Sequence, residues 1–455
     1  MTTTVPASMI GAFVTPETYG AIGNGSTDDT SAINAAATAA GIWGQVFMNP
    51  AKTYRITASI TPLTGQRWYG GGKITTANGY NFDAFSLVGK TDVTIEGLRG
   101  ESGTLGVAYS SATARFVAAK SASHRCRVIR CSTTGFQSAV QFDNSTDCEA
   151  IDNVIVNPYG WGINVQTDAD FAEVRGNRIT GAVNEHGIYV GGSSGNAVLG
   201  VKVLENWVSA CTIDGIKVSY ADDTLVRGNH TFLNGGEGVY VTVGANRTEV
   251  LGNHVYQNGG NGIIVHTGTA ADTIDRNRVI GNVVRKNDKN GIAVTYASTG
   301  AVSNTVVLDN DVDDNDQEAT GSQYGVVLGG GASNTGAWVS GNRITNEPTG
   351  IVVASSVAGA RLGQNVFSGN TTNITNSGTG TIIEQQTSGA TTTVTDGATI
   401  THGHPKTPTS VTATGSVASQ MVSVTAMGAT TFTVAIKTDA GAAGSSQTVY
   451  WRAAG

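Results

Sequence analysis

The chain has little proline, little charge and few cysteines for its length. Of its 455 residues, 8 are proline, 4 are cysteine and 13% are charged. Four cysteines, Cys126, Cys131, Cys148 and Cys211, are too few and too clustered for a disulfide framework, so we expect buried free thiols. The net charge of −7 gives no reason to expect nucleic acid or an anionic membrane as a partner.

Long apolar runs are also missing. The segment from Met1 to Phe13 has neither a basic stretch nor an apolar run, and we find no run elsewhere that could span a bilayer. The sequence therefore predicts no membrane insertion and no export signal, and a protein made in a cytoplasm.

Glycine is abundant, at 61 residues, and much of it belongs to a repeat. One phrase is Gly followed by alternating apolar residues, as in Gly187-Ile188-Tyr189-Val190, and it starts at positions 162, 187, 215, 238, 262, 291, 325 and 350. The other is a Gly-Asn-like step before an apolar residue, as in Gly252-Asn253-His254-Val255, with its Asn at 153, 177, 206, 229, 253, 282, 310, 342 and 365. An apolar period of two predicts strands with one buried face.

The spacing of the repeat indicates how these strands are arranged. A unit of about 24 residues with two or three short strands, and no helix between them, predicts a parallel β-helix in which equivalent positions stack. Gly and Asn accept left-handed turn geometry at low cost, and stacked Asn side chains can hydrogen-bond along the axis. We therefore expect these Gly and Asn residues to be structural.

The N-terminal segment carries a resemblance to a known family. Thr27-Asp28-Asp29-Thr30 precedes an Ala-rich stretch that ends at Gly41, which predicts a helix. Together with Tyr19-Gly20-Ala21-Ile22-Gly23-Asn24-Gly25, it resembles the opening of the pectate-lyase superfamily of right-handed β-helices, which includes polygalacturonase-like enzymes and many phage tailspikes. The resemblance covers about residues 14–60. It implies an all-β coil with an N-terminal cap helix, and Asp28 and Asp29 as capping residues rather than catalytic acids.

Composition divides the chain into four parts. We expect an N-terminal arm at 1–15, a cap region at 16–80, the parallel β-helix at 81–390 and a small antiparallel β domain at 391–455. Ile400-Thr401-His402-Gly403 and Val449-Tyr450-Trp451-Arg452 in the last part look similar to the short β-sandwich that ends many phage tail fibres. That likeness implies a trimerisation domain, and hence a homotrimeric tailspike in the virion that contacts phage tail or baseplate proteins.

Polar and aromatic residues concentrate on the turns from 161 to 240. Aromatic faces stack on sugar rings, while carboxylates and Lys bind hydroxyls. We therefore expect a saccharide groove on the outer face of these turns, and an ordinary solvated face is the alternative. The predicted substrate-binding residues are Trp161, His186, Tyr189, Lys217 and Tyr240.

The candidate catalytic residues are three carboxylates, Glu185, Asp214 and Glu237. Asp214 and Glu237 hold equivalent positions on neighbouring turns, about 5 Å apart along the axis, which suits a retaining glycosidase. Glu185 and Glu237 are two turns apart, about 9.5 Å, which suits an inverting one. A lyase with Lys217 or His186 as base stays open. No polygalacturonase-type catalytic phrase occurs, so no family catalytic residue is carried over.

Two further clusters are candidates for metal binding. The run from Asp309 to Asp316 is rich in oxygen ligands for Ca²⁺, although it lacks the glycine and closing glutamate of an EF-hand, and a solvated acidic loop is the alternative. No other cofactor is expected. His402 and His404 from three chains would place six nitrogens around one axis, and two ordinary surface histidines are the alternative.

Three functions follow as hypotheses. The first is a phage receptor-binding tailspike that binds a bacterial surface polysaccharide, with depolymerase activity left open between hydrolase and lyase. The second is a tail fibre that is adhesive or structural and has no active site. The third, a free polysaccharide lyase or hydrolase, is disfavoured by the missing export signal.

Overall fold

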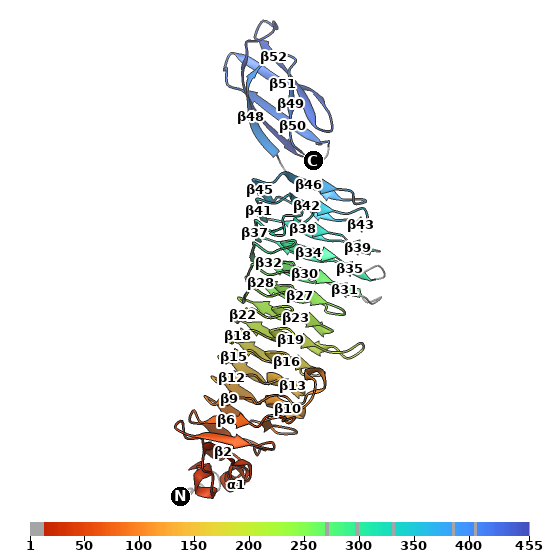
Figure 1. Cartoon of the computed structure of the whole chain (residues 1–455). Coiled ribbons are helices and arrows are strands. Elements are labelled where there is room, and N and C mark those ends of the chain that lie inside the picture. The colour runs from red at the N-terminus through yellow and green to blue at the C-terminus, as the bar shows by residue number, and fades with distance from the viewer. Residues whose placement is uncertain are drawn as a thin grey trace, which may run out of the picture.

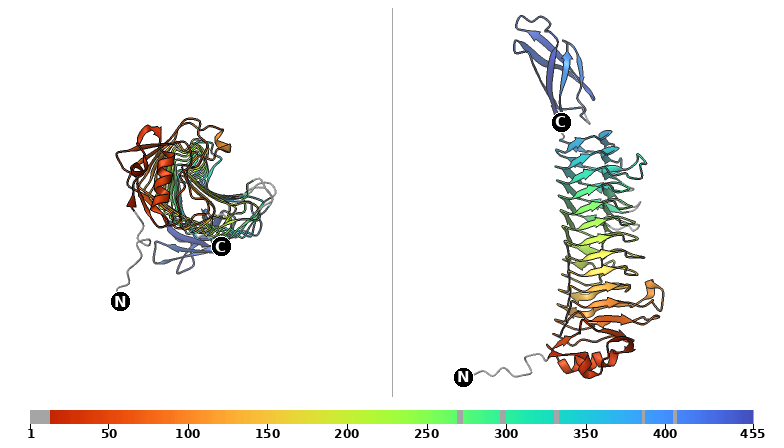
Figure 2. Two further views of the ribbon diagram at one scale, coloured as in Figure 1. Left: turned by 90° about the horizontal axis from the view of Figure 1, so that it is seen from below. Right: turned by 60° about the vertical axis from the view of Figure 1, so that its left-hand side comes forward.

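The protein is a long rod of coiled parallel strands with a helix at one end and a small β module at the other (Figure 1). This computed structural model describes residues 13–268, 273–295, 300–329, 333–384, 387–404 and 407–454. Most of the predicted arm lies outside these residues. Figure 2 shows the coil from its end and from a second side. The prediction of a right-handed parallel β-helix with one cap helix and C-terminal antiparallel sheets is confirmed.

Three parallel sheets run along the described part of the rod. Sheet A has 15 strands: β1 (Phe13–Val14), β3 (Gln45–Phe47), β5 (Arg67–Tyr69), β8 (Thr94–Glu96), β11 (Arg127–Ile129), β14 (Glu149–Ile151), β17 (Glu173–Arg175), β21 (Lys202–Leu204), β25 (Leu225–Arg227), β28 (Glu249–Leu251), β32 (Arg278–Ile280), β36 (Val306–Leu308), β40 (Trp338–Ser340), β44 (Arg361–Leu362) and β47 (Ile382–Ile383). Sheet B has 14: β2 (Asn24–Asp28), β4 (Thr53–Ile56), β6 (Lys73–Thr76), β9 (Arg99–Glu101), β12 (Ser132–Thr134), β15 (Val154–Val156), β18 (Arg178–Thr180), β22 (Trp207–Ser209), β26 (His230–Phe232), β29 (His254–Tyr256), β33 (Val283–Arg285), β37 (Asp311–Asp313), β41 (Arg343–Thr345) and β45 (Val366–Ser368). Sheet C has 12: β7 (Phe85–Ser86), β10 (Arg115–His124), β13 (Ser138–Thr146), β16 (Ile163–Gln166), β19 (Ile188–Gly191), β23 (Ile216–Ser219), β27 (Val239–Thr242), β30 (Ile263–His266), β34 (Ile292–Thr295), β38 (Tyr324–Leu328), β42 (Thr349–Val353) and β46 (Thr372–Asn376).

The turns that lead from sheet C to sheet A carry short sheets of their own, which project beside the rod (Figure 1). One pairs β20 (Val198–Leu199) with β24 (Ala221–Asp222). The other contains β31 (Thr273–Asp275), β35 (Ala301–Ser303), β39 (Ser333–Thr335) and β43 (Val357–Ala358). The length of each repeat unit therefore varies mainly in this part of the coil.

The N-terminal end of the coil is closed by helix α1 (Thr30–Ala40), which follows the 3-10 turn η2 (Pro16–Tyr19). Ile33, Ala36 and Ala37 face the coil's core, and Figure 2 shows α1 across the coil's end. Within the described chain, no helix is long and apolar enough to cross a membrane. A second 3-10 turn, η3, spans Tyr109–Ser111.

The two acids before α1 have structural roles, as the resemblance implies, but each carboxylate binds different groups. The Asp28 carboxylate accepts hydrogen bonds from the Thr30 backbone N–H (3.1 Å) and the Thr57 hydroxyl (2.7 Å). Asp29 is buried, and its carboxylate accepts the backbone N–H groups of Ile22 (2.7 Å) and Gly23 instead. Asp29 is the N-cap residue by position but forms no side-chain cap hydrogen bond. Asp28 instead accepts the N–H of the first helical residue, while Asp29 binds the preceding segment.

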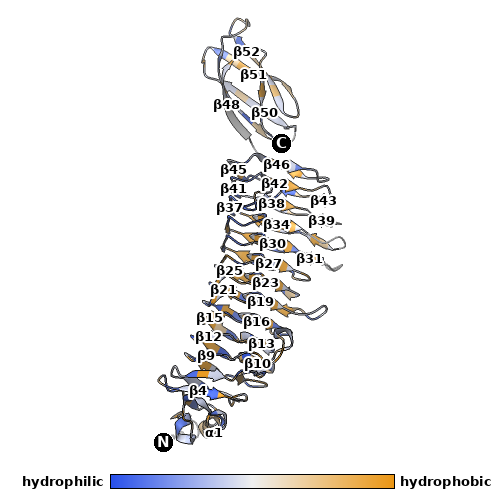
Figure 3. Cartoon of the chain, in the orientation of Figure 1, coloured by the Kyte–Doolittle hydropathy of each residue, from blue (hydrophilic) through white to orange (hydrophobic). Residues whose placement is uncertain are grey.

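The core is filled by the inward residues of the alternating strands, such as Ile216 and Val218 of β23, both fully buried. Figure 3 shows the corresponding alternation of hydropathy along the rod. All four cysteines are free and buried, as predicted.

The Asn column forms a continuous ladder inside the rod, and this prediction is confirmed. Asn253 is typical: its Nδ2 donates to Val226 O (3.0 Å) and to Asn282 Oδ1 (2.9 Å), and its backbone N–H donates to the same Oδ1 (2.8 Å). Each Asn therefore satisfies backbone groups that the turn would otherwise leave unpaired in the core. The ladder runs through Asn153, Asn177, Asn206, Asn229, Asn253, Asn282, Asn310, Asn342 and Asn365.

The left-handed residue of that turn is not the Asn but the residue before it. Gly252 has φ +60° and Gly281 has φ +66°. Where glycine is missing, Asp152, Glu205 and Asp309 adopt the same geometry. The expectation that Asn is chosen for left-handed φ is therefore wrong, because its hydrogen bonds explain the column.

A second ladder lies five residues further along each turn. Asn258 Nδ2, for example, donates to Asn287 Oδ1 (3.0 Å). The ladder contains Asn234, Asn258, Asn287, Asn315 and then Glu347, whose Oε1 accepts from Asn315 Nδ2 (2.8 Å). This ladder was not predicted.

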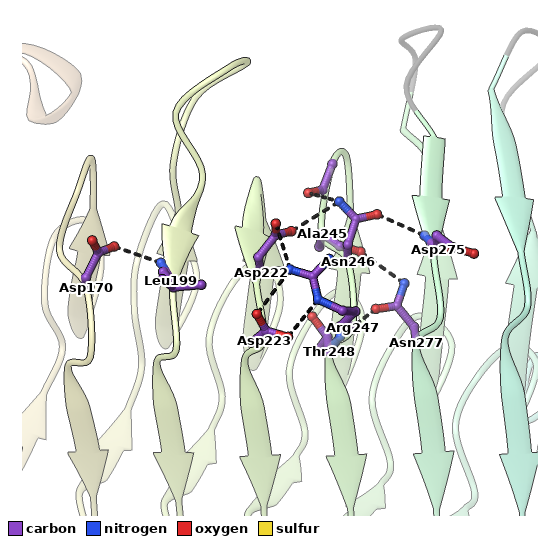
Figure 4. Close-up of polar contacts among 11 residues, drawn as sticks. Asp170, Leu199, Asp222, Asp223, Ala245, Asn246, Arg247, Thr248, Asp275 and Asn277 are labelled. Carbon is purple, nitrogen blue, oxygen red and sulfur yellow. Dashed lines mark hydrogen bonds and ion pairs between the residues drawn. The ribbon is translucent and has the colours of Figure 1, made fainter.

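Charged side chains also link neighbouring turns on the surface (Figure 4). Arg247 donates from Nε to Asp223 Oδ1 (2.7 Å) and from Nη2 to Asp222 Oδ2 (3.0 Å). Asn246 donates to Asp222 Oδ1 (3.1 Å) and accepts the backbone N–H of Asp275 (2.9 Å). A single polar cluster therefore joins three consecutive turns.

The C-terminal module consists of two three-stranded antiparallel sheets. One contains β48 (Thr387–Val394), β53 (Gln447–Ala454) and β50 (Ser410–Gly415), and the other β49 (Thr399–Thr401), β52 (Thr431–Thr438) and β51 (Gln420–Met427). Its own small core includes Phe432, Val434 and Val449. The division of the chain at 15, 80 and 390 stays a prediction.

Candidate saccharide-binding face

The outer face of sheet C carries three of the predicted substrate-binding residues, Tyr189, Lys217 and Tyr240, in register. Asn164 pairs with Tyr189, Tyr189 with Lys217, and Lys217 with Tyr240. We call this file the outer column. Its later members are Ile264, Ala293, Val327 and Val352. The outer column thus changes along the rod from polar and aromatic residues to apolar ones, as the repeat predicted.

The structure brings the aromatic members of this face together. The Tyr189 ring lies 6.3 Å from the Trp161 ring and stacks on His186 at 5.8 Å, with 18° between the planes. Lys217 Nζ lies 5.4 Å from the centre of the Tyr240 ring. Burial raises the pKa of both tyrosine hydroxyls, so both stay neutral donors at ordinary pH.

Tyr189 holds its position because of a glycine. The ring folds over Gly191, where an added Cβ would lie 2.3 Å from the tyrosine Oη. Tyr189 therefore lies along the sheet rather than standing out from it, and one side of its ring rests on backbone.

The predicted catalytic residues form a connected group at the edge of sheet C. His186 Nε2 lies 3.6 Å from Glu185 Oε2, and His186 Nδ1 lies 3.1 Å from Asp214 Oδ2. Asp214 is in turn hydrogen-bonded to the next turn, since its Oδ1 accepts the Glu237 backbone N–H at 2.8 Å. Glu185, His186, Asp214 and Glu237 thus lie in one chain of contacts across three turns.

The residue before each repeat glycine belongs to a third ladder, which we call the edge column. Each side chain accepts the backbone N–H of the equivalent residue on the next turn. The acceptors are His186, Asp214, Glu237, Asn261 and Asn290, and the last donor is Tyr324. Asp214 and Glu237 therefore accept backbone N–H groups of the next turn, as Asn261 and Asn290 do further along the rod. The sequence-based prediction missed this structural role. The signal was present in the sequence, because all of these positions carry hydrogen-bond acceptors.

The electrostatics of the two acids differ from those of the amides that follow. Burial, together with the charge of Asp214, raises the pKa of Glu237 to about 7. Its Oε2 accepts the Asn261 N–H. A carboxyl that exchanges its proton near neutral pH is suited to general acid–base chemistry. His186 Nδ1 lies 3.3 Å from the Asp214 backbone nitrogen, whose N–H it accepts, and 3.1 Å from Asp214 Oδ2.

The outer column extends further towards the N-terminus than the sequence indicated. Gln141 pairs with Asn164, and both are 1% exposed although they point outward. Gln141 Oε1 and Asn164 Oδ1 are buried without a hydrogen-bond partner among the described residues. The phrase pattern missed Gln141 because Ala139 stands where the later turns have glycine.

The acidic run at 309–316 binds protein groups rather than standing free. Asp311 pairs with Arg343 at 2.7 Å. Asp313 Oδ1 accepts from the Thr345 hydroxyl, and Asp316 accepts two backbone N–H groups. Within the described ranges, no three His, Cys, Asp or Glu side chains form a metal-holding group. Calcium binding by the run stays a prediction.

His402 and His404 are buried in the C-terminal module, not surface residues. His402 contacts Gly428 O through Nε2 (3.1 Å) and accepts the His404 backbone N–H at Nδ1 (2.9 Å). Both ring nitrogens of His402 therefore already have protein partners, and a metal shared by His402 and His404 of three chains stays a prediction.

Family models match two stretches of the chain. A model of the right-handed beta helix region matches residues 115–279, and one of the periplasmic copper-binding protein (NosD) matches residues 212–403. The described residues contain no cluster that would hold copper. No curated protein matches the chain in sequence.

Solved structures of similar fold come from several functional classes. A double mutant of the tailspike protein of E. coli bacteriophage HK620, in complex with pentasaccharide, has 12% identity and a TM-score of 0.59 over 97% of this chain and 93% of that one. The Azotobacter vinelandii mannuronan C-5 epimerase AlgE4 A-module has 15% identity and a TM-score of 0.54, covering 82% of this chain and 99% of its own. The Streptococcus pneumoniae surface adhesin PfbA has 13% identity and a TM-score of 0.51, with coverage of 82% and 100%.

At these identities the likeness concerns the fold. The stacked turns, the parallel register and the matched β-helix region agree with one another and with the N-terminal motif. The chain is a right-handed parallel β-helix protein.

Proposed function

We propose that this protein binds a polysaccharide along the outer face of sheet C. The observation that carries the proposal is the contact between Trp161, Tyr189, Lys217 and Tyr240, which lie on consecutive turns. Successive turns are about 4.8 Å apart, so rings two turns apart are spaced by about 9.6 Å, close to the length of two sugar units. The connected side chains of Glu185, His186, Asp214 and Glu237 border this strip.

The finer form of the proposal is a homotrimeric phage tailspike that recognises a bacterial surface polysaccharide. In its support, the similarity to the HK620 tailspike extends over nearly the whole chain, including the C-terminal module. On this proposal the protein is made in the host cytoplasm, becomes part of the virion and contacts phage tail or baseplate proteins. The C-terminal module would then join three chains.

Replacing Tyr240 with Ala should weaken polysaccharide binding about tenfold, because a sugar ring loses its aromatic stacking partner. Binding is measured on immobilised capsules and O-chains purified from a panel of bacterial strains. Tyr19→Ala, which removes an exposed tyrosine from the cap region, is the matched control and should bind like the parent. Equal binding by the parent and the Tyr240 variant would locate the contact elsewhere.

Cleavage of the bound polysaccharide is the second candidate function. The pKa of about 7 at Glu237, beside Asp214, favours it over a purely adhesive role. The edge-column hydrogen bonds favour a purely adhesive role, because in them both acids accept backbone N–H groups of the next turn.

Glu237→Gln separates these roles. The glutamine oxygen can still accept the Asn261 N–H, so the fold and the binding should persist, while a lost proton donor should slow cleavage about 100-fold. The rate is followed by the release of reducing ends or of unsaturated products, which also tells hydrolase from lyase. Glu249→Gln, at a half-exposed ion pair with Arg278, is the control. A parent protein that cleaves none of the polysaccharides it binds would support the adhesive role.

A further inference from the structure

A second aromatic surface lies on sheet B, away from the sheet C face. The Phe232 and Tyr256 rings stack at 5.0 Å with 2° between their planes, since they are register neighbours on β26 and β29. Beside them, Trp207 stacks on His230 at 4.4 Å, and His230 on His254 at 4.8 Å. In a parallel sheet such spacing follows from the strand separation. The repeat pattern alone did not indicate this surface.

The Phe232–Tyr256 stack ends at two adjacent cations, Arg285 and Lys286. On the next turn, Arg285 takes the register position that follows Tyr256. Among the described residues, Phe232 is the only aromatic ring that stacks on Tyr256, and no cation–π contact to Tyr256 is formed. Tyr256 is partly exposed, and a pocket lies beside it.

A pocket of about 320 Å³ is found at this end of the stack, lined by Tyr256, Gln257, Arg285 and Lys286. Arg285 and Lys286 are exposed, and neither forms an ion pair with a described residue. The lining contains two cations and no carboxylate, in a chain of net charge −7. The pocket thus combines local positive charge with an aromatic face.

A second pocket on the rod shows that arginines alone do not create such a site. It is lined by Asp223, Glu249, Arg247, Arg276 and Arg278 among others. There Arg247 is paired with Asp223 at 2.7 Å and Arg278 lies 3.5 Å from Glu249. Its cations are therefore held in ion pairs. Arg285 and Lys286 form none with a described residue, although Asp313 takes the register position that follows Arg285.

We infer that the Tyr256 pocket binds an acidic sugar unit, a pyranose that carries a carboxylate. The C–H face of the ring would stack on Tyr256. A guanidinium binds a carboxylate with two parallel hydrogen bonds, so Arg285 would take the acid group and Lys286 would add charge. The Gln257 amide can both donate to and accept from ring hydroxyls. This site lies on a different sheet from the proposed polysaccharide face and does not depend on it.

The test uses sodium galacturonate and glucuronate, with galactose and glucose as neutral counterparts, in ligand-observed saturation-transfer NMR on the full chain. The uronates should bind, the neutral sugars at least tenfold more weakly, and added salt should reduce uronate binding. The double substitution Arg285→Ala with Lys286→Ala should abolish it. The matched double substitution Arg276→Ala with Arg278→Ala removes equal charge from the other pocket and should leave it unchanged.

Three results would overturn the inference. These are uronate binding that survives loss of Arg285 and Lys286, neutral sugars that bind as tightly as uronates, and acetate or phosphate that competes as well as a uronate. The last would indicate a simple anion site without sugar recognition. Tyr240→Ala should not change uronate binding here, so failure of the proposed polysaccharide face is distinguishable from failure of this pocket.

Discussion

Replacing Gly238 with Ala is expected to destabilise the coil by at least about 3 kcal/mol, or to prevent it from folding. An added Cβ would lie 2.3 Å from Val255 Cγ1 and 2.6 Å from Gly262 O. The first atom belongs to the core side of sheet B, and the second is a backbone carbonyl of the next turn that pairs with Val239 N–H at 3.0 Å. Neither can move without opening the stack. Thermal unfolding followed by circular dichroism measures the loss.

Gly252 provides the matched control for this substitution. It has φ +60°, but an added Cβ would meet no atom within 4 Å. Gly252→Ala should therefore cost only the left-handed backbone strain, about 1 kcal/mol. Similar losses for the two variants would show that the repeat glycines are needed for backbone conformation rather than for space.

Replacing Glu347 with Gln should raise stability above pH 7 by about 3 kcal/mol and remove a pH dependence from the parent. Glu347 occupies an Asn position of the second ladder and is 2% exposed. Its Oε1 accepts from the Asn315 backbone N–H and Nδ2, while Oε2 is buried without a partner among the described residues. Burial chiefly, with the charges of Asp313 and Asp314, raises the pKa of Glu347 to about 7.

The direction of the pH effect follows from this raised pKa. The ordinary value is 4.5, so the folded state keeps its proton between pH 4.5 and 7 while the unfolded state loses it. The contribution to stability is thus fully present below pH 4.5 and is lost as pH rises to 7. Glutamine cannot ionise and offers the same acceptor oxygen, so the variant should not show this loss.

Thermal midpoints of parent and variant between pH 4 and 8 check this prediction. Glu237 titrates in the same range in both proteins, so the difference between the two curves is the quantity to compare. Glu384→Gln, at an ion pair with Arg361 that is half exposed, should leave the curve almost unchanged. A difference that stays constant from pH 4.5 to 7.5 would mean that Glu347 is ionised in the folded protein.

Much of the fold could be read from local pattern. The alternation in Gly187-Ile188-Tyr189-Val190 places Ile188 and Val190 in the core and Tyr189 outside, as observed. The repeated Asn predicted a ladder along the axis because one amide side chain can bond both to the backbone and to the next amide. The second ladder was missed although Asn234, Asn258 and Asn287 each follow an Asn of the first ladder by five residues.

The position of the candidate site could be predicted from the sequence, but the roles of its individual residues could not. The sequence placed Trp161, Tyr189, Lys217 and Tyr240 on one face, and they do lie together. It did not indicate that Asp214 and Glu237 accept backbone amides from the next turn. Those donors lie 23 and 24 residues away, at distances along the chain that vary with turn length.

By itself, the sequence determined the coil, its faces and its stacked columns, because each depends on a short pattern repeated at nearly constant spacing. Only the tertiary structure decided which polar side chains are used by the fold and which stay open to a ligand. A carboxylate such as Glu237 and a cation such as Arg285 look alike as outward polar residues of the repeat. One is hydrogen-bonded to the next turn and the other has no ion-pair partner among the described residues, and this difference arises only when the turns are stacked.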